Sequence, residues 1–248
     1  EITKDLALKS RNFEMFRNYM SLATRDISTT YRAEPKTAEL SVEKLKAAID
    51  DFRESRPEYK AMLASYERSI SSYERRIASA LKILEMIGQP APEMDVAAWV
   101  TQDGDKPVDL NGKVILLDFW AVWCGPCIRT FPHLKHLDET YGDKGLQIVG
   151  VTRYYNYTWN EKTEKAVRGQ KADADLEHDA LRKFLASHGL KHPTIVVPKE
   201  SEMQRNFGVS GIPHAVVIDQ NGAIQLIKVG SGEANAVAIE AKIKELLK

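Results

Sequence analysis

The chain has only two cysteines in 248 residues, and no apolar run approaches the roughly 20 residues that a membrane-spanning helix needs. Basic and acidic residues number 35 each, so the formal net charge is zero and no long block of one sign occurs. Nothing in this balance points to nucleic acid or to an anionic membrane surface as a partner. Two cysteines at one site fit an oxidising or a reducing compartment equally well.

Glycine is absent before Gly88, and only Pro35 and Pro57 interrupt a segment rich in Ala, Glu, Lys and Arg. This composition, with its two proline breaks, predicts three helices, at about 3–32, 37–54 and 57–87. Gly88 and the Gln89–Pro92 segment are typical of a helix stop followed by an extended linker. We therefore expect a helical bundle domain over residues 1–88 and a second domain over residues 89–248, for which the length leaves room.

Apolar residues recur at heptad spacing in the third predicted helix, and shorter stripes occur in the first two. The third stripe consists of Leu63, Tyr66, Ile70, Tyr73, Ile77, Ala80, Leu84 and Ile87. The simpler interpretation, which we favour, is that the three helices pack on one another. The alternative is that the long stripe also recruits a partner or a second copy of the chain.

The most informative stretch is residues 114–132, VILLDFWAVWCGPCIRTFP. Val114–Phe119 has the length and composition of a buried parallel strand, and Cys124 begins a predicted helix, with Pro126 suited to its first turn. Cys127 then lies one turn from Cys124, so that the two sulfurs can bond. Because the start of a helix favours negative charge, the pKa of Cys124 should fall and its thiolate should be the attacking group. Cys127 is suited to resolve a mixed disulfide.

Three other roles for the cysteines are less consistent with the pattern. A zinc site needs two further ligands, and the five-residue gap from Cys127 to His133 is short for a zinc finger that would use His133 and His136. A purely structural disulfide would more often close a longer loop. Inert core cysteines do not fit the strand–turn–cysteine context. We expect no metal and no cofactor.

The segment Trp120-Ala-Val-Trp-Cys-Gly-Pro-Cys127 resembles the active-site signature of the thioredoxin superfamily. Ala91-Pro92-Glu93, Asp109–Val114 and Phe131-Pro132 resemble its TlpA/ResA branch, whose members are exported or membrane-tethered in bacteria. The likeness covers about residues 90–248. It implies an α/β thioredoxin-like fold, a central mixed sheet flanked by helices, and a periplasmic or otherwise extracytoplasmic location. The chain begins with Glu1 rather than Met, so we expect that a preceding segment was removed, by a signal peptidase or by design.

The remaining elements of the second domain follow from local patterns. They are an edge hairpin within 93–110 turning at Asp103-Gly104-Asp105, an active-site helix at 124–141, strands at 146–152 and 194–197, a helix at 176–188, strands at 216–219 and 224–228 joined by an Asn-Gly turn, and a closing helix at 234–247.

Gly211-Ile212-Pro213 precedes an apolar strand, where thioredoxin-like proteins carry a cis-proline facing the dithiol. We expect the Ile212–Pro213 bond to be cis, and we regard His192-Pro193 as a weaker rival. By the same resemblance, the substrate-binding residues are Trp123, Gly125, Pro126, Ile212, Pro213 and Gly230. His214 is expected to be exposed beside them, either biasing the thiolate charge or having a plain surface role.

Asp118 is the one charged residue inside a strand that should be buried on both faces. An unpaired carboxylate there is costly, so Asp118 should be largely protonated, or linked to water, at neutral pH. The matching acid of thioredoxins shuttles the proton of the inner cysteine, which implies the same role for Asp118 toward Cys127. ResA-like proteins often have a glutamate three residues beyond the second cysteine, where this chain has Thr130.

Four aromatic residues lie within Tyr154–Trp159, after a parallel strand, and so on the same rim as the active site. They form either a substrate-contacting lip or local packing. The predicted function is thiol–disulfide exchange with protein substrates and an upstream redox partner. Gly125-Pro126 resembles the dipeptide of reducing thioredoxins more than that of oxidising relatives, which implies net reduction. Alternatives are a redox-sensing module that docks through its N-terminal helices, and a peroxide-reducing relative, although the peroxiredoxin pattern Pro-x-x-x-Thr-x-x-Cys is absent.

Overall fold

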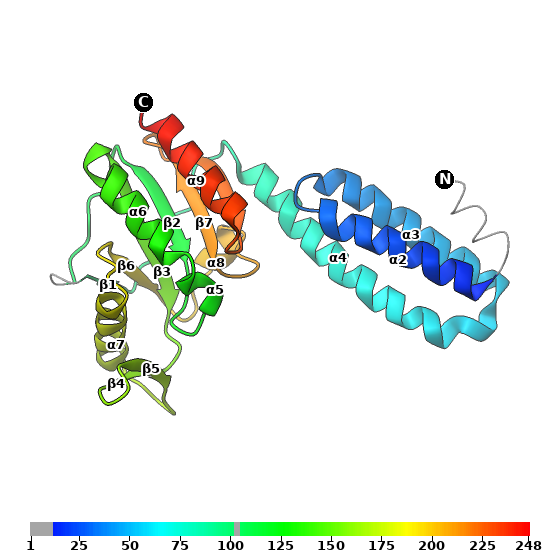
Figure 1. The fold of residues 1–248 in the computed structure, drawn as a ribbon, viewed down its shortest axis with the longest axis horizontal. Coiled ribbons are helices and arrows are strands. Elements are labelled where there is room, and N and C mark those ends of the chain that lie inside the picture. The colour runs from blue at the N-terminus through cyan, green and yellow to red at the C-terminus, as the bar shows by residue number, and fades with distance from the viewer. Residues whose placement is uncertain (1–11, 102–104) are drawn as a thin grey trace. The chain divides into compact units, whose positions relative to one another are not determined.

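The chain divides into two compact units, Glu1–Glu85 and Met86–Lys248 (Figure 1). The computed structural model describes residues 12–101 and 105–248. Each unit has its own apolar core. Within the described ranges no helix is long and apolar enough to cross a membrane.

The first unit is built from three helices, α2 (Phe13–Thr30), α3 (Pro35–Ser55) and α4 (Lys60–Met86), with the short 3-10 helix η1 (Pro57–Tyr59) before the last. Asn12 caps α2 by accepting hydrogen bonds from the N–H groups of Glu14 and Met15. The second helix starts two residues earlier than predicted, because Pro35 fits the first helical turn. Residues 3–11 of the first predicted helix lie outside the described residues.

The helices of the first unit bury their apolar stripes against one another, as in a three-helix bundle. Phe16 and Phe52 stack with ring centroids 4.2 Å apart in the centre of this core. In the α4 stripe, Leu63, Ile70 and Ile77 are buried, whereas Leu84 is 49% exposed. The stripe therefore packs within the bundle over most, but not all, of its predicted length.

The second unit contains a six-stranded sheet in the order β1-β6-β3-β2-β7-β8. Its strands are β1 (Ala98–Val100), β2 (Val114–Phe119), β3 (Leu146–Arg153), β6 (Thr194–Val197), β7 (His214–Ile218) and β8 (Ile224–Val229). β3 runs parallel to β2 and β6, and the other pairs are antiparallel. All six residues of β2 are buried, as expected for a central strand. The predicted thioredoxin-like mixed sheet is confirmed.

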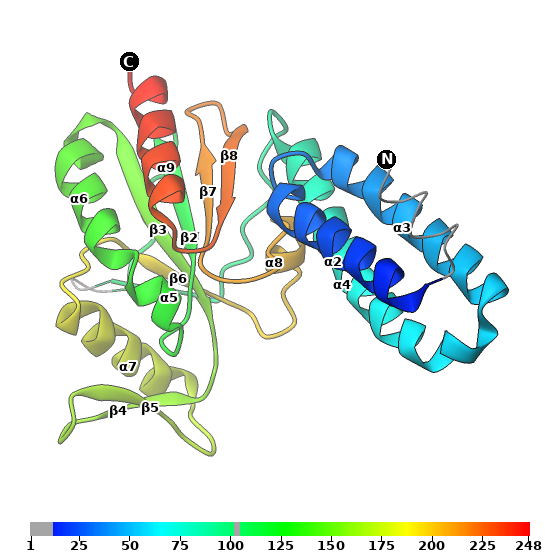
Figure 2. The same ribbon diagram turned by 45° about the vertical axis from the view of Figure 1, so that its right-hand side comes forward.

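Helices α6 (Phe131–Tyr141), α7 (Ala174–Ser187) and α9 (Glu233–Leu246) share one core with Val114 and Leu116 of β2 (Figures 1 and 2). Because side chains alternate along a strand, Asp118 belongs to the same face of the sheet as Leu116. Phe119 belongs to the other face, where it contacts Phe207, directly after the short helix α8 (Met203–Asn206).

The active-site helix is not continuous as predicted but breaks into α5 (Gly125–Ile128) and α6. Pro132 is the cause, because it has no N–H to bond with the carbonyl of Ile128 and its ring crowds that carbonyl. Thr130 lies at the break, and its hydroxyl donates to the carbonyl oxygen of Cys127 at 2.7 Å. A 3-10 turn, η2 (Gly142–Lys144), follows α6.

Other predictions for the second unit need correction. The described part of 93–110 contains β1, which pairs with β6 and not with a hairpin partner in its own segment. Asp103 and Gly104 of the predicted turn lie outside the described residues. The segment after β3 forms an unpredicted hairpin of β4 (Tyr157–Asn160) and β5 (Lys165–Arg168).

Candidate functional site

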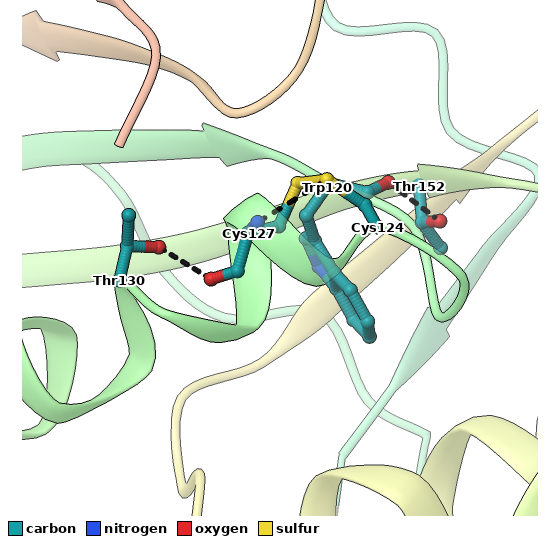
Figure 3. Close-up of a disulfide and its surroundings, with 5 residues drawn as sticks. All are labelled: Trp120, Cys124, Cys127, Thr130 and Thr152. Carbon is teal, nitrogen blue, oxygen red and sulfur yellow. Dashed lines mark hydrogen bonds between the residues drawn. A yellow bond between two sulfur atoms is a disulfide. The ribbon is translucent and has the colours of Figure 1, made fainter. Parts of the chain in front are cut away.

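Cys124 and Cys127 form a disulfide across the first turn of α5, with their Cα atoms 5.2 Å apart (Figure 3). Cys124 is the N-cap residue of α5, and its sulfur accepts a hydrogen bond from the backbone N–H of Cys127 at 3.2 Å. Cys124 is 3% exposed and Cys127 is fully buried. A donor directed at the Cys124 sulfur is the local feature that stabilises a thiolate there when the pair is reduced.

Trp120 holds the turn between β2 and the dithiol in place. Its ring stacks on Phe184 at 5.5 Å and meets Phe131 edge to face at 5.6 Å. The carbonyl oxygen of Trp120 accepts a hydrogen bond from the hydroxyl of Thr152 on β3 at 3.0 Å (Figure 3). The sequence interpretation gave Trp120 and Thr152 no role, because both depend on partners distant in the chain.

Asp118 lies on β2 behind the dithiol and is 3% exposed. Burial raises the pKa of its carboxyl from 3.8 to about 7, and within the described ranges its Oδ2 has no hydrogen-bond partner. The expectation of a protonated or water-linked carboxyl agrees with this position. Asp118 lines a cavity of about 160 Å³ together with Thr130, whose hydroxyl is bonded to the Cys127 carbonyl. The cavity is therefore lined by the acid and by a residue that is hydrogen-bonded to the inner cysteine.

The Ile212–Pro213 peptide bond is cis, as predicted, and immediately precedes β7. The carbonyl oxygen of Pro213 accepts a hydrogen bond from the N–H of Gly230 at 2.8 Å. Gly230 has φ +97°, a conformation that favours glycine, and its own carbonyl accepts from the side-chain amide of Asn235 at 2.8 Å. Pro213 and Gly230 line the Asp118 cavity, so the structure brings these predicted site residues together.

Trp123, Gly125 and Pro126 are exposed on the outer side of the dithiol turn. Trp123 is 51% exposed, and its ring meets Tyr155 edge to face with centroids 5.5 Å apart. The backbone N–H groups of Tyr155 and Tyr157 both donate to Glu177 on α7, at 2.8 and 3.2 Å. The aromatic segment thus packs against α7 and contacts the motif through Tyr155, as the local-packing interpretation predicts, and substrate contact by this segment stays a prediction.

Glu177 is the residue in this region that sequence reasoning missed. Its carboxylate is 6% exposed and anchors the loop after β3. An acidic residue in the first turn of a helix, as Glu177 is in α7, usually indicates only favourable interaction with the helix dipole. Only the fold reveals that the carboxylate turns toward the aromatic loop.

His214 is not exposed as predicted but fully buried, in edge-to-face contact with Phe119 at 5.6 Å. Burial lowers the pKa of its imidazole to about 4, although a contact with the backbone of Phe207 opposes the shift. The prediction failed because His214 is the first residue of β7, on the same face of the sheet as Phe119. His192 is also buried, and burial lowers its pKa to about 4.

The family model described as Redoxin matches residues 87–246, which contain every site residue above. The chain belongs to the Redoxin family. Among Redoxin-like relatives, "Thioredoxin-like protein YneN" of Bacillus subtilis (strain 168) is 33% identical over 146 residues, 58% of this chain and 72% of that protein. "Thiol-disulfide oxidoreductase ResA" of Bacillus anthracis is 28% identical over 140 residues, 56% of this chain and 66% of that protein.

A Chlorobium tepidum protein of solved structure, assigned as a thiol:disulfide interchange protein DsbE, is 33% identical to this Redoxin chain. The match covers 65% of this chain and 98% of the other, with a TM-score of 0.48. The sequence relatives and the paired cysteines together confirm the predicted resemblance to thioredoxin-like thiol–disulfide oxidoreductases of the ResA type. The matched region leaves out residues 1–86.

Proposed function

We propose that this chain reduces disulfides in protein substrates, with Cys124 as the nucleophile, Cys127 as the resolving thiol and Asp118 as the acid–base group. The single observation that carries the proposal is a bonded cysteine pair that directly follows a strand with a buried carboxyl. The pKa of that carboxyl, about 7, lets it accept and release a proton near neutral pH.

The reaction proceeds in two exchange steps. The Cys124 thiolate attacks one sulfur of a substrate disulfide, forming a mixed disulfide and releasing the first substrate thiolate. Cys127 then transfers its proton to the Asp118 carboxylate and attacks the Cys124 sulfur. The second substrate thiolate leaves. The substrate disulfide has then gained two electrons, and the Cys124–Cys127 pair has lost two electrons and become a disulfide. An upstream dithiol must reduce this disulfide before the next cycle.

The proposed substrate groove runs past the dithiol between Trp123 and the Pro213–Gly230 pair. Gly125, Pro126 and Ile212 complete it. Trp123 supplies an exposed aromatic surface, and the Gly230 hydrogen bond to Pro213 fixes the opposite wall. An extended segment of a substrate protein is the ligand that fits between two such walls.

Two finer points belong to the same proposal and rest on likeness to thioredoxin-like proteins. The Gly125-Pro126 dipeptide resembles that of reducing thioredoxins and so favours net reduction, with the final direction set by the potentials of the partners. An extracytoplasmic location is proposed from the same likeness.

Trapping of mixed disulfides tests the proposal. Cys127→Ser should accumulate covalent complexes with substrate proteins that dithiothreitol releases, because the resolving thiol is missing. Cys124→Ser is the matched control and should trap none. Equal trapping by both variants, or peroxide consumption that Cys124→Ser abolishes while no disulfide is reduced, would contradict the proposal. Function that survives Cys124→Ser but not loss of residues 1–88 would favour the docking alternative.

A further inference from the structure

The cavity beside Asp118 contains a second titratable side chain that the proposed exchange steps do not use. His133, in the first turn of α6, lines the same cavity as Asp118. The Nε2 atom of His133 and the Oδ2 atom of Asp118 are both buried, and neither has a hydrogen-bond partner among the described residues. Two buried, unpaired polar atoms that line one cavity are the usual setting for internal water.

The cavity is large enough to hold that water. Its volume is about 160 Å³, whereas a single water needs roughly 10–15 Å³ of such space. His133 is only partly buried, whereas Asp118 is 3% exposed and lines the same cavity. A neutral imidazole can take a proton on one nitrogen and release another from the second.

We propose that His133 is a positioning residue that relays protons between the Asp118 carboxyl and solvent through water in this cavity. The proposal rests on the proposed role of Asp118 toward Cys127. When Asp118 is protonated, its proton passes through cavity water to Nε2 of His133, and the other ring nitrogen releases a proton to solvent. The carboxylate that remains then accepts the proton of Cys127, which frees the sulfur to attack Cys124. No electron moves in the relay itself.

The charged groups around the relay allow His133 to stay neutral. Burial and the neighbouring His136 lower the pKa of His133, whereas Glu240 on α9 and the backbone of Ala236 raise it. The other charged groups that line the cavity are Arg129 after α5, Lys228 on β8 and Glu233 at the start of α9. For Asp118, burial is the cause of the raised pKa.

A substrate disulfide that releases a coloured thiolate in each exchange step allows the rates of the two steps to be measured separately. The relay should affect only the second step. Mixing the reduced protein with 5,5′-dithiobis(2-nitrobenzoate) releases one thiolate when Cys124 attacks and a second when Cys127 resolves. At about pH 6, where Asp118 must first lose its proton, His133→Gln should slow the second phase by about tenfold and leave the first unchanged. At about pH 9, where the carboxyl is already ionised, the two proteins should agree.

Two comparisons make the outcome decisive. His136→Gln, at an exposed residue one turn further along α6 and outside the cavity lining, should leave both phases unchanged. Added imidazole should restore the second phase of His133→Gln, which a merely structural defect would not allow. If His133→Gln does not fold, His133→Asn takes its place in the same test.

Failure of the relay and failure of the proposed function give different results. If wild-type protein shows both phases and Asp118→Asn slows the second, but His133→Gln behaves as wild type at both pH values, the relay is wrong and the function stands. If wild-type protein shows no second phase, the resolving role of Cys127 fails and the relay fails with it.

Discussion

The carboxylate of Glu177 accepts a hydrogen bond from the backbone N–H of Tyr155 at 2.8 Å, which fixes the loop that contacts Trp123. The same oxygen accepts from Tyr157, so one buried side chain satisfies two backbone donors. Leaving such donors unpaired costs more than the hydrogen bonds themselves contribute.

Glu177→Ala should therefore lower the free energy of unfolding by about 1–3 kcal/mol. Urea unfolding measures the change, and intrinsic fluorescence reports whether the environment of Trp123 changes with it. Glu177→Gln keeps an acceptor oxygen and is the matched control, with a smaller loss. An Ala variant as stable as the Gln variant would show that the loop does not depend on this carboxylate.

Asp118→Asn should stabilise the protein at alkaline pH. The pKa of the folded carboxyl, about 7, lies above its ordinary value of 3.8, so the unfolded chain loses its proton first as the pH rises. Stability therefore falls between about pH 4 and pH 7, by up to about 4 kcal/mol in total, and Asn removes this loss. Unfolding at about pH 8 should show the gain and at about pH 3.5 should show little. The same gain at both pH values would contradict a buried, titrating carboxyl.

Gly150→Ala should destabilise the sheet beside the dithiol. An added Cβ would lie 2.5 Å from the Thr194 hydroxyl oxygen and 2.7 Å from Nε1 of Trp120, so both side chains would have to move. We expect a loss of about 1–3 kcal/mol in thermal or urea unfolding. Gly211→Ala is the control, because its Cβ would meet nothing within 4 Å. Equal behaviour of the two variants would show that the sheet tolerates the crowding.

His214→Leu should reduce the sensitivity of the fold to acid. Burial lowers the pKa of the imidazole to about 4. Between pH 6.5 and 4 the imidazole is therefore protonated in the unfolded chain and neutral in the folded chain. Wild-type stability loses about 3 kcal/mol from this one group over that range, and the Leu variant should not. Comparing unfolding free energies at about pH 7 and pH 4 isolates the difference. An unchanged pH dependence would mean that His214 titrates normally.

The strand–turn–cysteine stretch could be interpreted from sequence because its chemistry and its geometry are local. The order of residues from Val114 to Cys127 is enough to indicate a buried strand, a turn and a helical first turn, although distant residues hold the turn in place. Asp118 was recognisable for the same reason, as a charge in an otherwise apolar strand. The cis Ile212–Pro213 bond was predicted from the family resemblance and is present.

Features that depend on tertiary contacts were missed or misplaced. His214 looked exposed because it follows a turn, but pairing of β7 with β2 buries it against Phe119. The role of Glu177 depends on a loop 20–22 residues away in the chain. His133 appeared only as a poor zinc ligand, because its relation to Asp118 exists only once α6 packs over the sheet.

The acidity of the Cys124 thiol tests the central claim most directly. In reduced Cys127→Ser protein, the rate of iodoacetamide alkylation against pH reports the pKa of Cys124 alone. We predict a pKa below the ordinary cysteine value of about 8.5, because α5 begins at this residue and a backbone N–H donates to its sulfur. A Cys124 pKa no lower than that of free cysteine would contradict the assignment of Cys124 as the nucleophile.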